Sequence, residues 1–204
     1  MSDHCRLVWI RRHEQRVVPW HNGGGSTREV AVEPADGSLD AGFAWRVSIA
    51  DVASDGPFSR FAGIDRSLWL LNGAGMELDL DGERVVLDQP LQRFDFAGER
   101  AVTARLLDGP TSDLNVMVTR ARVAASAAVH AIGEGHVHPL ALAAGQHLLL
   151  SLTGTAILFG GVLGPGDALL MHGTGRGDLL AADGSCSFLS ASFVPRETAA
   201  GPVA

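Results

Sequence analysis

Two stretches of similar pattern decide the fold: LLNGAGMELDLDGERVVLDQPLQRFDFAGE at residues 70–99 and LSLTGTAILFGGVLGPGDALLMHGTG at residues 150–175. Each reads as a strand, a glycine turn, a strand, a second glycine turn, a strand, a proline-bearing turn and a strand that ends in glycine. Laid side by side, they match at Gly73 and Gly154, Leu78 and Leu158, Gly82 and Gly161, and Gly98 and Gly173. Such an internal repeat predicts two copies of one supersecondary unit.

The hydrophobic period elsewhere is two, which is typical of half-buried strands. FAWRVSIA (43–50) and MELDL (76–80) alternate clearly, and QRFDF (92–96) less so. The pairs Asp81-Gly82 and Asp183-Gly184 are hairpin turn signals. No amphipathic helix longer than about three turns is predicted. The alanine-rich segment around residues 121–131 fits either a helix or a strand.

The order of strands and turns, above all LGPGDALLMHG (163–173), resembles the second half of the cupin motif, a small jelly-roll barrel. We therefore predict an all-β bicupin, with two cupin-like barrels in tandem. The first barrel is expected over residues 1–122 with the ligand pocket, and the second over residues 123–204, packed on the first as one compact unit.

Composition excludes several classes of function. The 204 residues carry a formal charge of -7 without a basic block, which argues against nucleic acid as a partner. All sixteen basic residues are Arg, so lysine chemistry is absent. Cys5 and Cys186 show no disulfide or zinc spacing, and no stretch has the length and apolarity of a signal peptide or membrane span. A cytoplasmic protein without membrane contact is expected.

Anion recognition is expected in the first barrel, because thirteen of the sixteen arginines precede residue 121. In metal-binding cupins a glutamate ligand lies seven residues before the first turn glycine. Arg66 occupies that place in the first repeat, and Arg46-x-Ser48 lies upstream on one strand face. Two arginines and a serine repel a cation and suit a carboxylate. Alternatively, the arginines form ordinary surface ion pairs with nearby aspartates.

The second repeat offers a competing metal hypothesis. His147 takes the equivalent place, and His136-x-His138 lies upstream, so three imidazoles could hold Zn²⁺, Fe²⁺ or Mn²⁺ in an isomerase- or oxygenase-like enzyme. Two features argue against it. The gap from His138 to His147 is long for a cupin, and Leu169 stands where a fourth ligand should follow the turn. Catalytic residues and cofactors are otherwise not predicted.

Two loops are candidates for ligand contacts. PWHNGGGST (19–27) is similar to a phosphate loop but lacks its GK[ST] ending, which leaves a small anion nest or a plain connection. DGPFSRFAGIDRS (55–67) is longer than a hairpin needs. Its Phe58 and Phe61 could wall a planar ligand, or could simply anchor the loop.

Three separated blocks resemble the HutD/Ves family of bicupin proteins: PWHNGGGSTREVAVEP (19–34), FAWRVSIADVASDGPFSRFAGIDRSLWLLNGAG (43–75) and DGPTSDLNVMVTRA (108–121). The resemblance implies a two-cupin fold, a homodimer and, for the HutD branch, a non-enzymatic role in histidine utilisation, sensing or buffering an intermediate such as urocanate or a formylated glutamate. It places the shared polar positions at Asn22, Arg46, Ser48, Arg66 and Asn115.

The sequence departs from the family at His21, where Lys is usual, and at Ala62, where Pro is usual. The resemblance does not separate HutD from Ves. The leading hypothesis is a small-carboxylate-binding regulator or buffer that uses Asn22, Arg46, Ser48, Phe58, Arg66 and Asn115. A metal-dependent cupin enzyme and a ligand-free scaffold are the alternatives.

Overall fold

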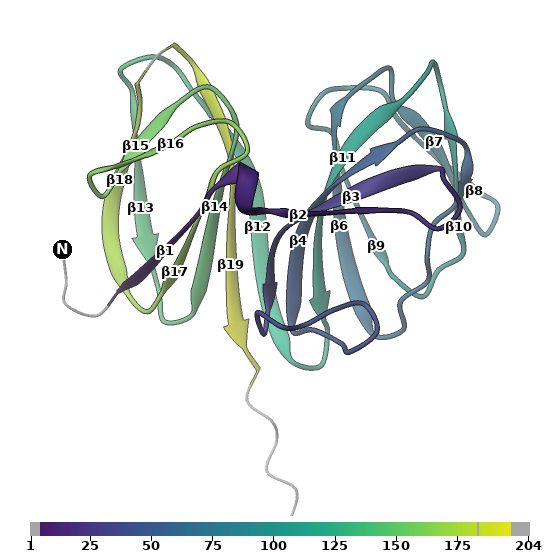
Figure 1. Ribbon diagram of the computed structural model, residues 1–204, viewed down its shortest axis with the longest axis horizontal. Coiled ribbons are helices and arrows are strands. Elements are labelled where there is room, and N and C mark those ends of the chain that lie inside the picture. The colour runs from purple at the N-terminus through teal and green to yellow at the C-terminus, as the bar shows by residue number, and fades with distance from the viewer. Residues whose placement is uncertain (1–4, 183, 197–204) are drawn as a thin grey trace, which may run out of the picture. The chain divides into compact units, whose positions relative to one another are not determined.

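The computed structural model describes residues 5–182 and 184–196. Apart from one turn of 3₁₀ helix, η1 (Arg12–Glu14), every regular element in this part of the chain is a strand (Figure 1). The strands form four antiparallel sheets in two compact units. We call residues 16–123 the Arg unit, and residues 5–15, 124–182 and 184–196 together the His unit. The predicted all-β class is confirmed.

The Arg unit is built from a six-stranded and a four-stranded sheet. The larger has the order β2-β3-β4-β11-β6-β9, with β2 (Arg16–Pro19), β3 (Gly25–Glu33), β4 (Trp45–Val52), β11 (Thr111–Thr119), β6 (Ile64–Asn72) and β9 (Arg93–Ala97). The smaller has the order β5-β10-β7-β8, with β5 (Gly56–Pro57), β10 (Val102–Leu106), β7 (Met76–Leu80) and β8 (Glu83–Leu87).

The His unit repeats this plan with a five-stranded and a four-stranded sheet. The larger has the order β1-β17-β14-β19-β12, with β1 (Arg6–Ile10), β17 (Ala168–His172), β14 (Gln146–Thr153), β19 (Cys186–Pro195) and β12 (Val123–Ile132). The smaller has the order β13-β18-β15-β16, with β13 (Val137–Leu142), β18 (Gly175–Ala181), β15 (Ala156–Leu158) and β16 (Gly161–Leu163). The alanine-rich segment is thus strand β12.

The internal repeat is visible in the strand order, because β4-β11-β6-β9 corresponds to β12-β19-β14-β17 and β5-β10-β7-β8 to β13-β18-β15-β16. Matching backbone hydrogen bonds fix the register. Gly98 donates to the carbonyl of Ile64 over 2.7 Å, and Gly173 donates to that of Gly145 over 2.9 Å. Each acceptor lies two residues before the key polar residue of its repeat, so Arg66 and His147 hold equivalent positions.

One matched glycine pair needs a correction. Asp81 and Gly82 have φ values of 55° and 92° in the β7–β8 turn, and Phe159 and Gly160 have 49° and 75° in the β15–β16 turn. Gly82 therefore corresponds to Gly160, not to Gly161. The second predicted Asp-Gly hairpin lies between β18 and β19, but its Asp183 falls outside the described residues.

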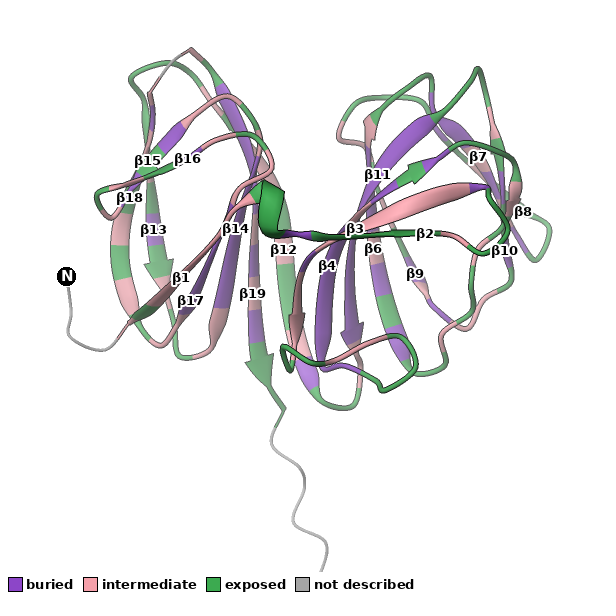
Figure 2. Cartoon of the chain, viewed as in Figure 1, coloured by how far each residue is buried: buried purple, intermediate pink, exposed green. Residues whose placement is uncertain are grey.

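In each unit the core lies between the two sheets (Figure 2). In the Arg unit, alternate residues of β4 and β6 such as Val52, Leu68 and Leu70 meet Leu78 and Leu80 of β7. In the His unit, a second set from both sheets packs in the same way: Leu140, Leu149, Ala156, Leu158, Leu163, Leu169, Met171, Leu179, Ala181, Cys186 and Phe188. Period-two patterning therefore buries one face of each sheet.

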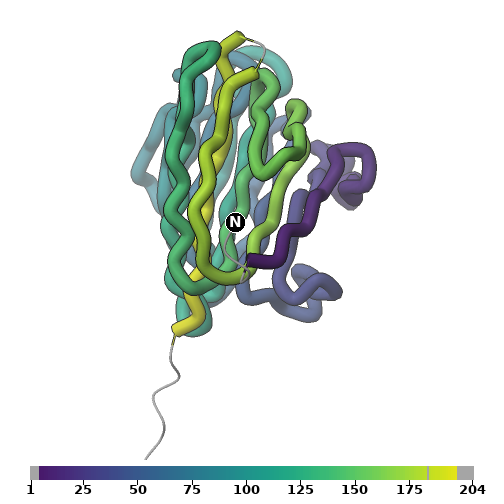
Figure 3. The backbone as a smooth tube through the Cα atoms, turned by 90° about the vertical axis from the view of Figure 1, so that its left-hand side faces the viewer, coloured from purple at the N-terminus to yellow at the C-terminus, as the bar shows by residue number. Residues whose placement is uncertain are grey.

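The first fifteen residues were expected in the first barrel, and their described part belongs to the His unit instead. Strand β1 pairs along β17, from Arg6 opposite His172 to Ile10 opposite Ala168 (Figure 3). Asp167 then accepts hydrogen bonds from the Arg11 side chain and from the Arg12 backbone, at 2.8 and 2.9 Å. These long-range contacts leave no local signal in the sequence.

Within residues 5–182 and 184–196 there is no helix with the length and apolar character needed to cross a lipid bilayer.

Candidate functional site

A set of polar side chains lies among the core residues of the Arg unit. We call it the arginine cluster: Arg46 and Ser48 of β4, Arg66 of β6, and Asp113 and Asn115 of β11, all buried. Strand pairing aligns them, because Asn115 lies opposite Ser48 on one side and Leu68 on the other. The cluster thus continues the inward-facing rows of the core.

The charge of Arg46 is compensated within the cluster's surroundings. Its Nε donates to Glu29 Oε2 over 2.7 Å, and its terminal nitrogen donates to Ser48 Oγ over 3.2 Å. Glu29 lies on the neighbouring strand β3, opposite Ser48. A buried guanidinium is held most securely when a carboxylate shares its charge. Arg46 is therefore a paired cation.

Arg66 has different surroundings. It donates one hydrogen bond, to Asn115 Oδ1 over 2.7 Å, and its guanidinium carbon lies 5.3, 5.8 and 4.9 Å from the ring centres of Phe58, Phe61 and Phe96. Among the described residues, no carboxylate comes within ion-pair distance of Arg66, and its buried Nε has no hydrogen-bond partner. Arg66 is a buried cation surrounded mainly by aromatic faces.

Asp113 balances Arg66 only in part. Its side chain is 1% exposed and accepts a hydrogen bond from Asn115 Nδ2. Burial raises the pKa of Asp113 to about 7, although the charge of Arg66 acts in the opposite direction. Burial also lowers the pKa of Arg66, to about 10. Below pH 7 Asp113 is mostly protonated, so the cluster then carries one positive charge without a counter-charge.

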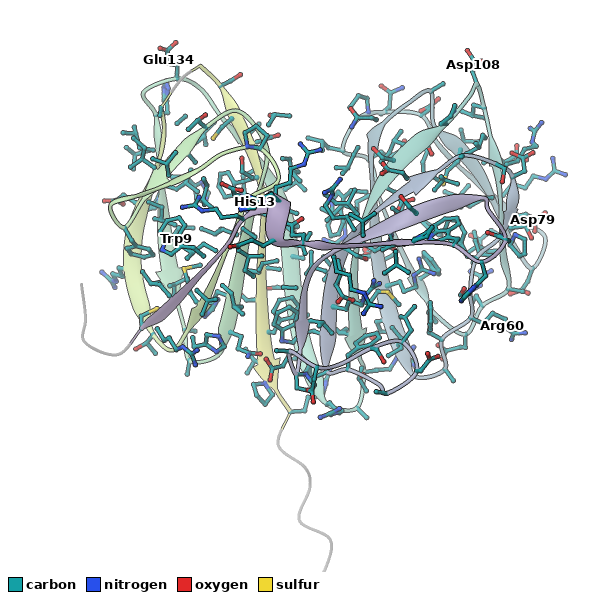
Figure 4. All side chains as sticks on the ribbon, in the orientation of Figure 1. Trp9, His13, Arg60, Asp79, Asp108 and Glu134 are labelled. Carbon is teal, nitrogen blue, oxygen red and sulfur yellow. The ribbon has the colours of Figure 1, made fainter. Side chains whose placement is uncertain are left out.

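Five of the six predicted ligand residues meet here. Arg46 bonds to Ser48 and Arg66 to Asn115, while the ring of Phe58 faces Arg66. Their role in ligand binding stays a prediction. Phe61 also packs against Arg66, so the 55–67 loop places two rings on this cation. Arg60 of the same loop, labelled in Figure 4, is exposed, and its Nε donates to the Glu99 carbonyl over 2.9 Å.

Asn22 is placed elsewhere. It lies exposed in the turn between β2 and β3, and its Oδ1 accepts a hydrogen bond from the Gly24 backbone over 3.0 Å. This local Asx turn is a common structural use of asparagine. The glycine-rich segment is thus a hairpin connection in the structure.

Sequence reasoning missed Glu29 and Asp113. Asp113 stands two positions before Asn115 on an alternating strand, so the face-sharing rule already used for Arg46 and Ser48 would have found it. Glu29 carried no comparable signal, because its relation to Arg46 depends on the pairing of β3 with β4.

The three histidines of the metal hypothesis do not meet. His136 is exposed in the turn before β13, with its Nδ1 3.0 Å from the Glu134 carbonyl, and Glu134 lies at the tip of that turn (Figure 4). His136 and His138 have separate surroundings, because the ring of His136 bonds in the turn before β13, whereas the ring of His138 lies against that of His130. Both ring nitrogens of His147 are already occupied, by Ser192 Oγ at 2.8 Å and the Ala143 carbonyl at 2.9 Å.

Across the described residues, no three His, Cys, Asp or Glu side chains are grouped so that they could hold a metal ion. The residues present therefore do not fit the metal centre of a cupin enzyme. His130, which the metal hypothesis did not include, is the residue that accompanies His138, with ring centres 4.6 Å apart.

Comparison with known proteins identifies the family. The model of the HutD family matches residues 12–188. The chain belongs to the HutD family. This family is associated with histidine utilisation. One relative, an uncharacterised 21.2 kDa protein in the hutC 3′ region of Pseudomonas putida, is 35% identical over 156 residues, which cover 74% of this chain and 81% of the relative.

Two solved structures are similar over nearly their whole length. HutD from Pseudomonas fluorescens SBW25, in a formate condition, has a TM-score of 0.80 at 33% identity, covering 94% of this chain and all of that one. A conserved protein of unknown function from Pseudomonas aeruginosa PAO1 has a TM-score of 0.82 at 34% identity, covering 92% and 98%.

Two further similarities cover part of the chain or the fold alone. The Ves protein of Citrobacter koseri is 40% identical over 113 residues, 54% of this chain and 56% of that protein. A cupin 2 conserved barrel domain protein from Leptotrichia buccalis, with a TM-score of 0.56 at 11% identity over 88% and 89% of the two chains, supports the cupin-like fold alone.

Proposed function

We propose that this HutD family member is a non-enzymatic, small-carboxylate-binding protein that acts as a regulator or buffer in histidine utilisation. The observation that carries the proposal is the buried Arg66, which has no carboxylate partner among the described residues and whose Nε donates no hydrogen bond. A ligand carboxylate would supply both the missing charge and the missing acceptor.

The surroundings of Arg66 favour a small organic anion over a bare inorganic one. Phe58, Phe61 and Phe96 present apolar rings around the guanidinium, and Asn115 offers an amide for a further polar contact. An acid with a planar or amide-bearing body would use both features. Urocanate and N-formylglutamate have this chemistry, and the family's association with histidine utilisation makes them the first candidates.

Calorimetric titration of the full chain with urocanate and with N-formylglutamate tests the proposal. We expect saturable heat with at least one of them, and loss of that heat in Arg66→Gln. Arg105→Gln is the matched control, because Arg105 is an exposed arginine of the same unit, paired with Glu77 at 3.4 Å. An absence of heat with both acids, or equal affinities in the two variants, contradicts the proposal. Homodimerisation belongs to the same proposal and is measured by analytical ultracentrifugation.

A further inference from the structure

A cavity lies wholly within the His unit. It has a volume of about 220 Å³, and its lining mixes apolar side chains, among them Leu140, Leu142, Leu149 and Met171, with the polar side chains of His130, His138, His147, Ser190 and Ser192. None of the described residues that line it has a carboxylate or guanidinium group. The arginine cluster lies in the other unit, so this cavity belongs to a different site.

Hydrogen bonds to protein groups occupy both ring nitrogens of His147. A carbonyl oxygen can only accept, so Nε2 of His147 carries the proton that it donates to Ala143. Nδ1 of His147 lies 2.8 Å from the hydroxyl of Ser192, which can donate or accept. Both ring nitrogens of His147 are therefore used by protein groups, and neither is free for a ligand.

His138 is the open polar group. Among the residues that the structure describes, neither of its ring nitrogens makes a hydrogen bond, and its contacts are with rings: His130 at 4.6 Å and the edge of Phe188 at 5.3 Å. His130 stacks on Phe188 at 5.0 Å and bonds to Ser190 Oγ over 2.8 Å. Burial, with a smaller contribution from His138, lowers the pKa of His130. The imidazoles of His130 and His138 thus pack against each other and against Phe188, and they bring ring nitrogens to the cavity.

We propose that this cavity binds a small, neutral, single-ring nitrogen heterocycle, which exchanges a hydrogen bond with His138 and packs against the leucine and methionine side chains of the lining. The size fits, because an engineered cavity of roughly 150 Å³ is enough for benzene. The ligand is expected to be neutral, because the lining offers no counter-charge and moving a charge into such a site costs several kcal/mol. A ring with one N–H and one bare nitrogen suits either tautomer of His138.

Pyrazole is a suitable probe, because it is neutral and carries both a donor and an acceptor nitrogen. The experiment titrates the full-length protein with pyrazole at pH 8, where imidazoles with ordinary pKa values near 6.5 are neutral, and follows the histidine ring signals by NMR. We expect saturable shifts of His130 and His138, with a dissociation constant on the order of 1 mM for so small a ligand. The ring signals of His21 and His136 should stay unchanged.

Variants locate the binding. His138→Leu should weaken pyrazole binding about tenfold by removing one hydrogen bond, and Ser190→Ala, which frees the ring of His130, should alter the affinity as well. His136→Ala is the matched control, an exposed histidine two residues away outside the cavity, and should bind as the wild type does. Shifts that do not saturate, or equal affinities in His138→Leu and His136→Ala, overturn the proposal.

A further arm keeps this site apart from the proposed carboxylate site. Arg66→Gln should lose carboxylate binding and keep the pyrazole shifts, whereas His138→Leu should do the reverse. Loss of pyrazole binding in Arg66→Gln but not in His138→Leu would place the ring in the arginine cluster and refute the second site.

Discussion

The Arg unit and the His unit share one strand order but differ in the chemistry of their interiors. Arg66 on β6 and His147 on β14 hold equivalent positions. Arg66 is a buried cation with one hydrogen bond, whereas both nitrogens of His147 are satisfied by protein groups. The same scaffold therefore holds a buried cation with an unpartnered Nε in one copy and a histidine with both ring nitrogens bonded in the other.

Truncation of a buried leucine should destabilise the two units by similar amounts. Leu68 and Leu149 both lie on the strand that carries the key polar residue, two positions after it, and both are fully buried. We expect Leu68→Ala and Leu149→Ala each to lower the free energy of unfolding by about 3–5 kcal/mol, through lost burial and the cavity left behind. Urea unfolding followed by fluorescence measures both. A cost below about 1 kcal/mol in one unit would show that its core is not packed as the structure indicates.

Phe188 is the counterpart of Asp113, because they pair with Ser151 and Leu70, each four residues after the key polar residue of its repeat. Asp113 gives the Arg unit a pH-dependent stability that Phe188 cannot provide. The folded pKa of Asp113, about 7, lies above the ordinary value of 3.8, so the folded state keeps a proton that the unfolded chain loses first. Its contribution to stability is therefore present below pH 4 and lost as the pH rises to 7. Relative to Asp113→Asn, the wild type should lose on the order of 3 kcal/mol between pH 4.5 and 7.5.

Unfolding curves of the wild type and Asp113→Asn at both pH values check this prediction. Asparagine keeps an acceptor for Asn115, so the variant isolates the ionisation. If the free energies of unfolding of the two proteins differ by the same amount at pH 4.5 and at pH 7.5, the pKa of Asp113 is not raised by folding.

Carboxylate binding should depend on Arg66 and not on its counterpart. We expect Arg66→Gln to weaken the binding of the responsive acid about a hundredfold, because a buried charge-assisted contact is typically worth 2 kcal/mol or more. His147→Gln should leave that affinity within about twofold, since His147 belongs to the other unit. Calorimetry with the acid identified in the first titrations measures both affinities. A similar loss of affinity in the two variants would show that carboxylate binding is not specific to the Arg unit.

The matched glycines should show the smallest effects. Gly73 and Gly154 have positive φ values, and an added Cβ would meet backbone oxygens, of Pro110 at 2.6 Å and of Ser185 at 2.4 Å. Gly73→Ala and Gly154→Ala should each cost about 1–3 kcal/mol of stability. Gly82→Ala, also at positive φ but with open space around the new atom, should cost about 1 kcal/mol. Thermal unfolding compares the three, and equal losses would show that the close approach is unimportant.

The sequence by itself determined the strand class, the repeat and most of the arginine cluster. These follow from local rules, because alternation fixes which side chains share a face, and glycine is favoured where φ is positive. Arg46, Ser48 and Arg66 were predicted in this way, and the family resemblance added Asn115.

Only the tertiary structure decided which unit takes β1, which carboxylates accompany the arginines, and which histidines meet. The pairing of β1 with β17 joins residues more than 150 positions apart, and that of β3 with β4 brings Glu29 to Arg46. The ring of His136 bonds to the carbonyl of Glu134 in the turn before β13, and Asn22 bonds to Gly24 within its own turn. Long-range strand register is set by the packing of whole sheets, so no local pattern could reveal these partners.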